Sequence, residues 1–308
     1  MGNQALTSEQ LYSPAMLAEL LQVSVRVIRR WYRAGLLQPT QVVMQVPYFC
    51  FSQVATAKQL ARWMRSGIKV QSIENQLRLI RSRVGEHVAL DTMRIVAHGK
   101  RLVLLDGDSV MEATGQFQFG FEADDHDTDR LPTTLRFEPA STKAAIPGAV
   151  QSLEQMINEA MEAEDVDDLD MAIDWYRAAL TAYGPNPDIC FQLAELLYRQ
   201  GDVSGARERY FMAIELDPGL VEAQANLGCV LAESGQLELA IAAFEGALQQ
   251  FSDYADVHFH LARALDDAGQ TDRAVDHWLR FLELAPVSPW AEEARERLGQ
   301  TNATWLDF

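Results

Sequence analysis

The chain has 308 residues, of which 26 are Lys or Arg and 44 are Asp or Glu, so its net charge is −18. Apolar residues make up 48% of the sequence, which excludes a disordered chain and predicts well-formed cores. Its three cysteines form no C-x-x-C motif, no apolar run is long enough to cross a membrane, and the first residues lack a secretory pattern. We therefore expect a cytoplasmic protein without disulfides, membrane spans, metal or cofactor.

The charge is divided unevenly along the chain. Residues 1–105 contain 14 basic and 5 acidic residues and carry a net charge of +9, whereas residues 106–308 contain 12 basic and 39 acidic residues and carry −27. Such opposed halves indicate one surface for a polyanion and another surface for a different partner. We expect any nucleic-acid contact to lie within the first hundred residues.

The first two predicted elements are short helices joined by a tight turn. Pro14 is typical of the first position of a helix, and Ser24 is the expected N-cap of a second helix that ends near Gly35. The first helix is expected to bury Met16, Leu17, Leu20 and Leu21, and the second to bury Val23, Val27, Ile28 and Trp31. Four arginines follow helical spacing on the outward face of the second helix: Arg26, Arg29, Arg30 and Arg33.

Further along the chain, the period of the apolar residues changes several times. Residues 38–51 alternate and predict a hairpin, or wing, and two helices are expected over 52–66 and 70–84. Residues 93–121 alternate again and predict three or four short strands, which could be a spacer, a dimer contact or a sensor. The predicted segments of this mainly α chain are a winged helix-turn-helix domain (1–90), a small β segment (91–121), a flexible acidic linker (122–147), a solenoid of helical repeats (148–300) and a loose tail (301–308).

One specific pattern covers the first helices. It runs from Tyr12 through Val23-Ser24, Ile28-Arg29 and Trp31-Tyr32 to Gly35-Leu36-Leu37-Gln38-Pro39. Together with the later stretch ARWMRSGIKVQSIENQL, it resembles the MerR-type winged helix-turn-helix over about residues 11–84. The resemblance implies that the basic helix enters the major groove of double-stranded DNA, where arginine grips guanine or phosphate. The residues implied in DNA contact are Ser24, Arg26, Arg29, Arg30, Arg33, Gln45 and Tyr48.

Three departures from that family's pattern keep other hypotheses open. Gln22 replaces the usual turn glycine, Phe49 stands where the wing usually has an arginine, and the long dimerising helix is short or absent after Val84. Because that helix normally joins two copies, dimerisation is not fixed by the pattern, and a homodimer stays one possible arrangement. The arginines could also form an ordinary solvated helix face, and the fold could serve as a scaffold in a multiprotein assembly without binding DNA.

The second half of the chain repeats every 34 residues. The repeat appears in Gly201, Gly235 and Gly269 and in Ala172, Ala206, Ala240 and Ala274. Aromatic residues accompany these positions at Tyr176, Tyr210, Phe244 and Trp278. The pattern resembles the tetratricopeptide repeat (TPR), which implies stacked helical hairpins with small residues where the two helices of a hairpin approach closely. The first repeat is degenerate, with acidic residues where the turn glycine belongs.

The resemblance to TPR proteins implies a concave groove lined by the first helix of each hairpin. The residues expected there are Phe191, Glu195, Tyr198, Arg199, Glu222, Cys229, Phe259 and Arg263, with Asp256 among further acidic positions. This mixture of carboxylates and aromatic rings favours a protein or peptide partner that is basic or amphipathic. The alternative is that the repeats stabilise themselves or pair with another copy.

Other polar clusters do not predict chemistry. His258, His260 and His277 are expected to pack in the repeats, and the acidic run around His126 lacks the glycine and terminal glutamate of a calcium loop. No phosphate-binding loop or nucleophile motif is present, so an enzyme is not predicted. The sequence favours a DNA-binding transcriptional regulator, or DNA-tethered adaptor, whose repeats bind a protein.

Overall fold

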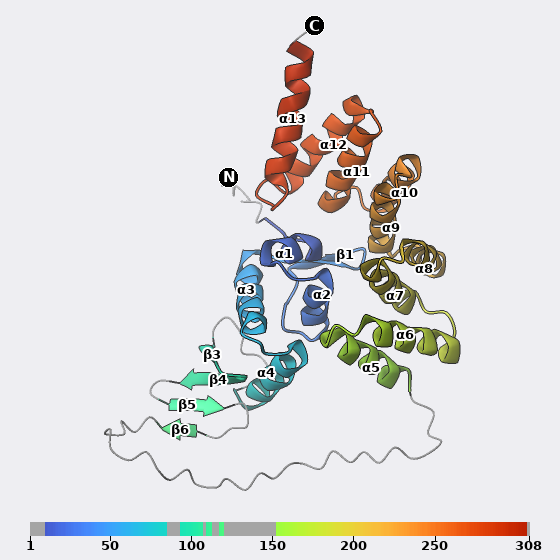
Figure 1. The fold of residues 1–308 in the computed structure, drawn as a ribbon. Helices are drawn as coiled ribbons and strands as arrows, with labels where there is room; N and C mark the ends of the chain where they lie inside the picture. Colours follow the sequence, from blue (N-terminus) through green and yellow to red (C-terminus); the bar gives the residue numbers. More distant parts are fainter. Residues whose placement is uncertain (1–9, 85–92, 107–108, 113–116, 120–151, 307–308) are drawn as a thin grey trace, which may run out of the picture.

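A computed structural model describes residues 10–84, 93–106, 109–112, 117–119 and 152–306. These residues form a mainly α protein, which confirms the predicted fold class. A winged helix-turn-helix and a small sheet make up the N-terminal part, and a curved array of helical hairpins makes up the C-terminal part (Figure 1). The predicted linker, 122–147, lies outside the described residues.

The N-terminal part follows the predicted order of elements. Its elements are α1 (Pro14–Leu21), α2 (Val25–Arg33), β1 (Gln41–Val43), β2 (Val46–Tyr48), α3 (Phe51–Arg65) and α4 (Val70–Val84). The Ser13 hydroxyl caps α1 by accepting a hydrogen bond from the Met16 N–H at 3.2 Å. Gln22 ends α1 in the left-handed conformation at φ 53°, so it takes the part of the usual turn glycine.

The core of this part lies between α1, α2, α3 and the hairpin. Ile28, Trp31 and Phe49 are fully buried there, so the arginine that the wing usually carries is replaced by a core residue. Leu20, which we expected to be buried, is 39% exposed, because only the other predicted residues of α1 face the core. One side of α2 therefore holds it firmly to its own domain.

A four-stranded antiparallel sheet follows, as the alternating pattern predicted. Its strands are β3 (Ile95–His98), β4 (Arg101–Asp106), β5 (Ser109–Glu112) and β6 (Phe117–Phe119), paired in that order. Leu102 of β4 is buried, and its N–H donates to the side-chain oxygen of Gln76 on α4 at 2.6 Å. The sheet is thus anchored on α4, on the side of the domain away from α1 (Figure 1).

The C-terminal part is a solenoid of helical hairpins. Its helices are α5 (Leu153–Asp165), α6 (Leu169–Tyr183), α7 (Pro187–Gln200), α8 (Val203–Leu216), α9 (Val221–Glu233), α10 (Leu237–Gln250), α11 (Ala255–Asp267), α12 (Thr271–Leu284) and α13 (Ala291–Leu306). Residues 301–306, which we expected to belong to a loose tail, continue α13.

Packing within each hairpin follows the 34-residue repeat. Gly228 of α9 lies so close to Phe244 of α10 that a Cβ on it would come within 2.5 Å of the ring. The turn glycines Gly201, Gly235 and Gly269 all have positive φ. In the first repeat Asp167 takes the corresponding place at φ 61°, a conformation that costs a residue with a Cβ more than it costs glycine.

The two parts of the molecule are packed against each other. The first helices of successive hairpins, α5, α7, α9 and α11, face the N-terminal part (Figure 1). Residues of α2 contact α5, α7 and α9, and Ser13, just before α1, contacts α11. The solenoid thus curves around the helix-turn-helix, and its inner groove is where the two parts meet.

Candidate functional site: the interface of the basic helix and the repeat groove

The sequence of α2 gives the helix two different faces. Ile28 and Trp31 point into the domain core, and the arginines lie opposite them, as the helical spacing predicted. The second face, however, does not point to solvent. Arg29 and Arg30 are only 6% and 9% exposed, because inner helices of the solenoid cover Arg29, and α4 and the end of α5 enclose Arg30.

Arg29 is the centre of the interface. Its Nη1 donates to Glu195 Oε1 of α7 at 2.5 Å, and its Nη2 donates to Glu222 Oε1 of α9 at 2.6 Å. The guanidinium lies 4.7 Å above the centre of the Phe191 ring. Burial alone would lower the pKa of Arg29, but the two carboxylates outweigh it and raise the pKa above its ordinary value. Arg29 is therefore a buried cation that pairs at the same time with two successive repeats, through α7 and α9.

Arg30 and Arg26 extend the contact to the first repeat. Arg30 Nε donates to Glu74 of α4 at 2.7 Å, and its Nη1 donates to Asp165 at the end of α5 at 2.5 Å. Arg26 pairs with Glu164, the neighbouring residue on α5. Burial lowers the pKa of Arg26 and raises that of Asp165. These opposite shifts indicate that removing the charges from water has a cost here.

A second set of contacts joins α1 and the wing to later repeats. The Ser13 hydroxyl donates to Asp256 Oδ2 of α11 at 2.5 Å. Asp256 is 5% exposed, and burial with the nearby Glu222 charge raises its pKa to about 7, although the Ser13 hydrogen bond opposes the shift. The ring of Tyr48 meets Phe251 edge-on, with centroids 6.0 Å apart.

The tip of the wing is strained and tied to the solenoid. Met44 and Gln45 both have positive φ, which residues other than glycine and asparagine adopt only at a cost. Gln45 Nε2 donates to Asp217 Oδ2 at 3.0 Å, in the loop before α9. The hairpin is therefore presented to the repeats rather than held free for another molecule.

The prediction that the arginines face outward is wrong for three of the four. The side chains of Arg26, Arg29 and Arg30 are paired with the chain's own carboxylates, and only Arg33 is exposed. The wing residues Gln45 and Tyr48 also contact repeats. We did not predict this contact between the two parts, because we assigned the +9 and −27 halves of the chain to two outside partners. The opposite charges instead complement each other within the chain. A role of these residues in DNA contact stays a prediction.

The groove residues are partly as predicted. Phe191, Glu195 and Glu222 contact Arg29, and Tyr198, Arg199 and Cys229 line the cavity beside it. One prediction is wrong: Phe259 is 2% exposed and packs between Trp278 and Trp290 in the core of the last repeats. Arg263 of α11 has an exposed side chain that lies 3.5 Å from Glu293, and its place in the groove stays a prediction.

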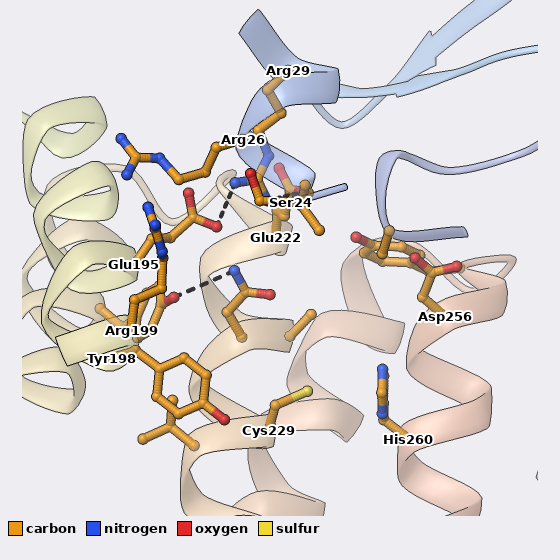
Figure 2. A pocket seen from close by; sticks show the side chains of 17 residues that line it. Ser24, Arg26, Arg29, Glu195, Tyr198, Arg199, Glu222, Cys229, Asp256 and His260 are labelled. Atoms are coloured by element: carbon orange, nitrogen blue, oxygen red, sulfur yellow. Dashed lines mark hydrogen bonds and ion pairs between the residues drawn. The ribbon is translucent and has the colours of Figure 1, made fainter. Parts of the chain in front are cut away.

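A cavity of about 280 Å³ remains between α2 and the groove. Figure 2 shows it with Ser24, Arg26 and Arg29 on one side and with Tyr198, Cys229 and His260 on the solenoid side. Val230 and Tyr254 complete an inner wall that is largely apolar. Burial raises the pKa of Cys229 to about 12, helped by the charges of Glu233 and Asp256. Because this wall faces the cavity, α2 leaves part of the apolar surface of the groove uncovered.

Several residues of this site escaped the sequence analysis. Glu164 and Asp165 looked like a degenerate turn, yet they bind two of the arginines. Ser13 was recognised only through its position before Pro14, and its hydroxyl also binds Asp256. A usable signal existed for the carboxylates, because Glu222 and Asp256 are one repeat of 34 residues apart and so occupy equivalent inner positions.

The described part of the chain contains no group of three or more His, Cys, Asp or Glu side chains placed to hold a metal ion. The Nδ1 atoms of His258 and His277 lie 2.9 Å apart, so these two rings pair with each other. Among the helices that the structure describes, none has the length and apolar character needed to cross a bilayer.

Sequence comparison identifies both parts of the chain. Residues 12–79 match the model of the MerR HTH family regulatory protein, and residues 157–221 and 231–277 match two models of the tetratricopeptide repeat. Both predicted resemblances are confirmed. The matched families are regulatory and protein-interaction domains. No curated protein sequence matches the chain at a significant level.

Several solved structures are similar to about half of this chain. One of them is MamA, 22% identical, covering 48% of this chain and 82% of its own, with a TM-score of 0.44. Another is YrrB, described as a TPR protein with an unusual peptide-binding site, 20% identical over 50% of this chain and 77% of its own, with a TM-score of 0.44. A tetratricopeptide repeat protein from Parabacteroides merdae is 19% identical over 51% and 62%, with a TM-score of 0.47.

Proposed function

We propose that this chain, a MerR-type helix-turn-helix joined to TPR repeats, is a DNA-binding regulator whose groove holds the recognition helix away from DNA until a partner protein takes its place. The observation that carries the proposal is the position of Arg29 between Glu195 and Glu222, over Phe191. DNA and the groove require the same guanidinium groups, so binding one excludes the other.

The chemistry of the groove supports this competition. A bidentate arginine satisfies two acceptor oxygens, whether they belong to carboxylates or to phosphates and guanine. Arg26, Arg29 and Arg30 use these donors on Glu164, Glu195, Glu222 and Asp165. With the groove occupied by α2, the surface that would read the major groove is covered.

The same interface has features of a reversible contact. Buried ion pairs gain little over water, because both charges must lose their hydration. Several buried atoms here have no hydrogen-bond partner among the described residues, including Glu195 Oε2, Asp165 Oδ2 and Arg29 Nε. An interface built from such pairs is less stable than an apolar one of equal size, so a competing ligand can open it.

The test of this proposal uses the double variant Glu195→Gln/Glu222→Gln, which keeps every arginine intact. Its affinity for a pool of random-sequence DNA duplexes, measured by fluorescence anisotropy at one fixed salt concentration, should exceed that of the unaltered chain by about tenfold or more. The reason is that Arg29 loses both partners and α2 is released.

The matched control is Glu245→Gln/Asp253→Asn, which changes the net charge equally but removes exposed pairs with Arg273 and Arg280. Equal gains in the two variants would mean that overall charge, and not release of α2, controls DNA affinity. Absence of duplex binding in every variant would reject DNA binding altogether.

A second candidate is a scaffold that does not bind DNA. It is supported by the wing, where residues 40–50 contain no Lys or Arg and where Phe49 is fully buried. In that case the docking of α2 would be a permanent domain contact. The charge-neutralised variant would then stay unable to bind duplexes and would only become less stable.

A further inference from the structure

We propose that the partner of the groove is a helix of another protein that carries arginines in the spacing of α2, preceded by a bulky apolar residue two positions before the first arginine. This proposal deepens the proposed function and rests on it, because it names the kind of protein that would displace α2. The groove's present occupant serves as the template for the partner.

The arginine spacing follows from the register of the carboxylates. Successive repeats present Glu164 and Asp165 on α5, Glu195 on α7 and Glu222 on α9. Positions i, i+3 and i+4 of a helix lie on one face, and in α2 these are Arg26, Arg29 and Arg30. Each of them reaches a carboxylate of the solenoid. A helix with the pattern R-x-x-R-R therefore fits, whereas the same charges on different faces do not.

The groove also demands a cation from any occupant. If α2 left without a replacement, Glu195 and Glu222 would lose the guanidinium that now neutralises them. Residues 106–308 as a whole carry a net charge of −27, so an acidic helix would be repelled, and a neutral helix would leave the two carboxylates without a counter-charge. Phe191, beneath Arg29, adds a ring face that favours a planar guanidinium.

The apolar residue follows from the cavity that α2 leaves. Apart from Arg26 and Arg29, which pair with carboxylates, the side chains that α1 and the start of α2 offer to this 280 Å³ space are small or short: Ala15, Ser24 and Val25. The opposite wall is larger and mainly apolar, with Tyr198, Cys229, Val230 and Tyr254. Figure 2 places Ser24 at the edge of this space, facing the solenoid helices.

Position 24 is free to change in a competing helix. Ser24 is the N-cap of α2, yet its side chain makes no capping hydrogen bond. A Phe or Leu at this position would enter the cavity and cover the apolar wall. Burying such a side chain increases affinity by about tenfold to 100-fold. A partner with the pattern Φ-x-R-x-x-R-R, where Φ is bulky and apolar, would therefore outcompete α2.

The proposal is tested with synthetic helices titrated into the full-length chain. The reference peptide copies residues 22–35 with Ile28→Ala and Trp31→Ala, because these two side chains serve the core of the N-terminal domain. A second peptide adds Ser24→Phe. A third keeps the composition of the second but places its arginines on three different faces. Binding is measured by fluorescence anisotropy of labelled peptide, without DNA.

The titrations are done with the unaltered chain and with the Arg29→Gln chain, whose own helix is held less tightly. We expect the Ser24→Phe peptide to bind at least about tenfold more tightly than the reference. The rearranged peptide should lose at least about tenfold. Glu195→Gln/Glu222→Gln should abolish binding, and Glu245→Gln/Asp253→Asn should leave it unchanged.

Equal binding of the rearranged peptide would overturn the proposal, since the groove would then attract any polycation. Equal affinity of the Ser24→Phe and reference peptides would contradict the part of the proposal that assigns a bulky apolar residue to the partner. No binding to the Arg29→Gln chain would reject the groove as a helix site. Each of these results is independent of DNA. A chain that binds the peptide but no duplex supports this inference and contradicts the proposed function. A chain that binds a duplex but no peptide contradicts this inference and leaves DNA binding supported.

Discussion

Two sets of arginine–carboxylate pairs in this molecule look alike but differ in environment. Arg29 with Glu195 and Glu222 is enclosed between two domains, where these side chains are 7%, 11% and 14% exposed. Arg273–Glu245 and Arg280–Asp253 join outer parts of the last hairpins, with side chains 40% to 55% exposed. Water already stabilises the exposed charges, so those pairs contribute little. Each enclosed pair needs both of its partners, because a lone buried charge is costly, and the proposed release of α2 relies on this dependence.

The largest effect is expected for Arg29→Ala. Two buried carboxylates lose their cation, which disfavours the closed arrangement by about 3–5 kcal/mol. Cys229 reports the opening, because its thiol lines the cavity and its raised pKa of about 12 suppresses the thiolate. We expect faster alkylation of Cys229, measured by mass spectrometry at fixed pH.

Two other thiols are internal controls for that measurement. Cys190 is fully buried inside the repeats and should stay slow, and Cys50, which is partly exposed and hydrogen-bonds to Thr40 and Ser52 of its own domain, should be unaffected. Unchanged alkylation of Cys229 in Arg29→Ala would contradict the view that Arg29 holds the two parts together.

An intermediate effect is expected from pH, through Asp256. Its pKa is about 7 in the closed arrangement, against an ordinary value of 3.8 once it is exposed, so the closed form binds the extra proton between these values. Closure is therefore most favourable at low pH, weakens by up to about tenfold per pH unit toward pH 7, and levels off above it. His260 does not contribute near neutrality, because burial lowers its pKa to about 4.

Duplex affinity measured from pH 5 to pH 8 checks this expectation. In the unaltered chain, the release of α2 should make the duplex affinity increase as the pH is raised to about 7. Asp256→Asn keeps an acceptor for Ser13 without a titrating charge, so that part of the rise should vanish and α2 should stay bound at pH 7. Asp253→Asn, at an exposed carboxylate, is the control. Identical pH profiles for Asp256→Asn and the unaltered chain would rule out Asp256 as the titrating group.

The smallest effect is expected for Arg280→Ala. Its partners Asp253 and Glu283 are exposed, so their charges remain hydrated after the change. The free energy of unfolding, measured by urea denaturation, should fall by no more than about 1 kcal/mol. A loss as large as that at Arg29 would remove the distinction between enclosed and exposed pairs.

Much of the fold was predictable because it depends on local periodicity. Gly201, Gly235 and Gly269 marked the hairpin turns, and Ser13-Pro14 marked the start of α1. The interface was not predictable in the same way. Spacing placed Arg26, Arg29 and Arg30 on one face, but whether that face meets solvent, DNA or another part of the chain depends on contacts between residues more than 100 positions apart. Phe259 shows the same limit, since its burial comes from Trp278 and Trp290.

The first hairpin of the solenoid has a consequence for how the array responds. It stands at one end of the described array, where α6 packs on α7 of the next repeat, and it turns through Asp167 where later hairpins use glycine. In a linear array the terminal unit is the first to fray. Arg26 and Arg30 pair with Glu164 and Asp165 at the end of α5 and so hold the first hairpin in place. If α2 leaves the groove as proposed, the array loses these contacts at its end as well as its bound helix, so the stiffness of the superhelix would depend on the occupancy of its groove.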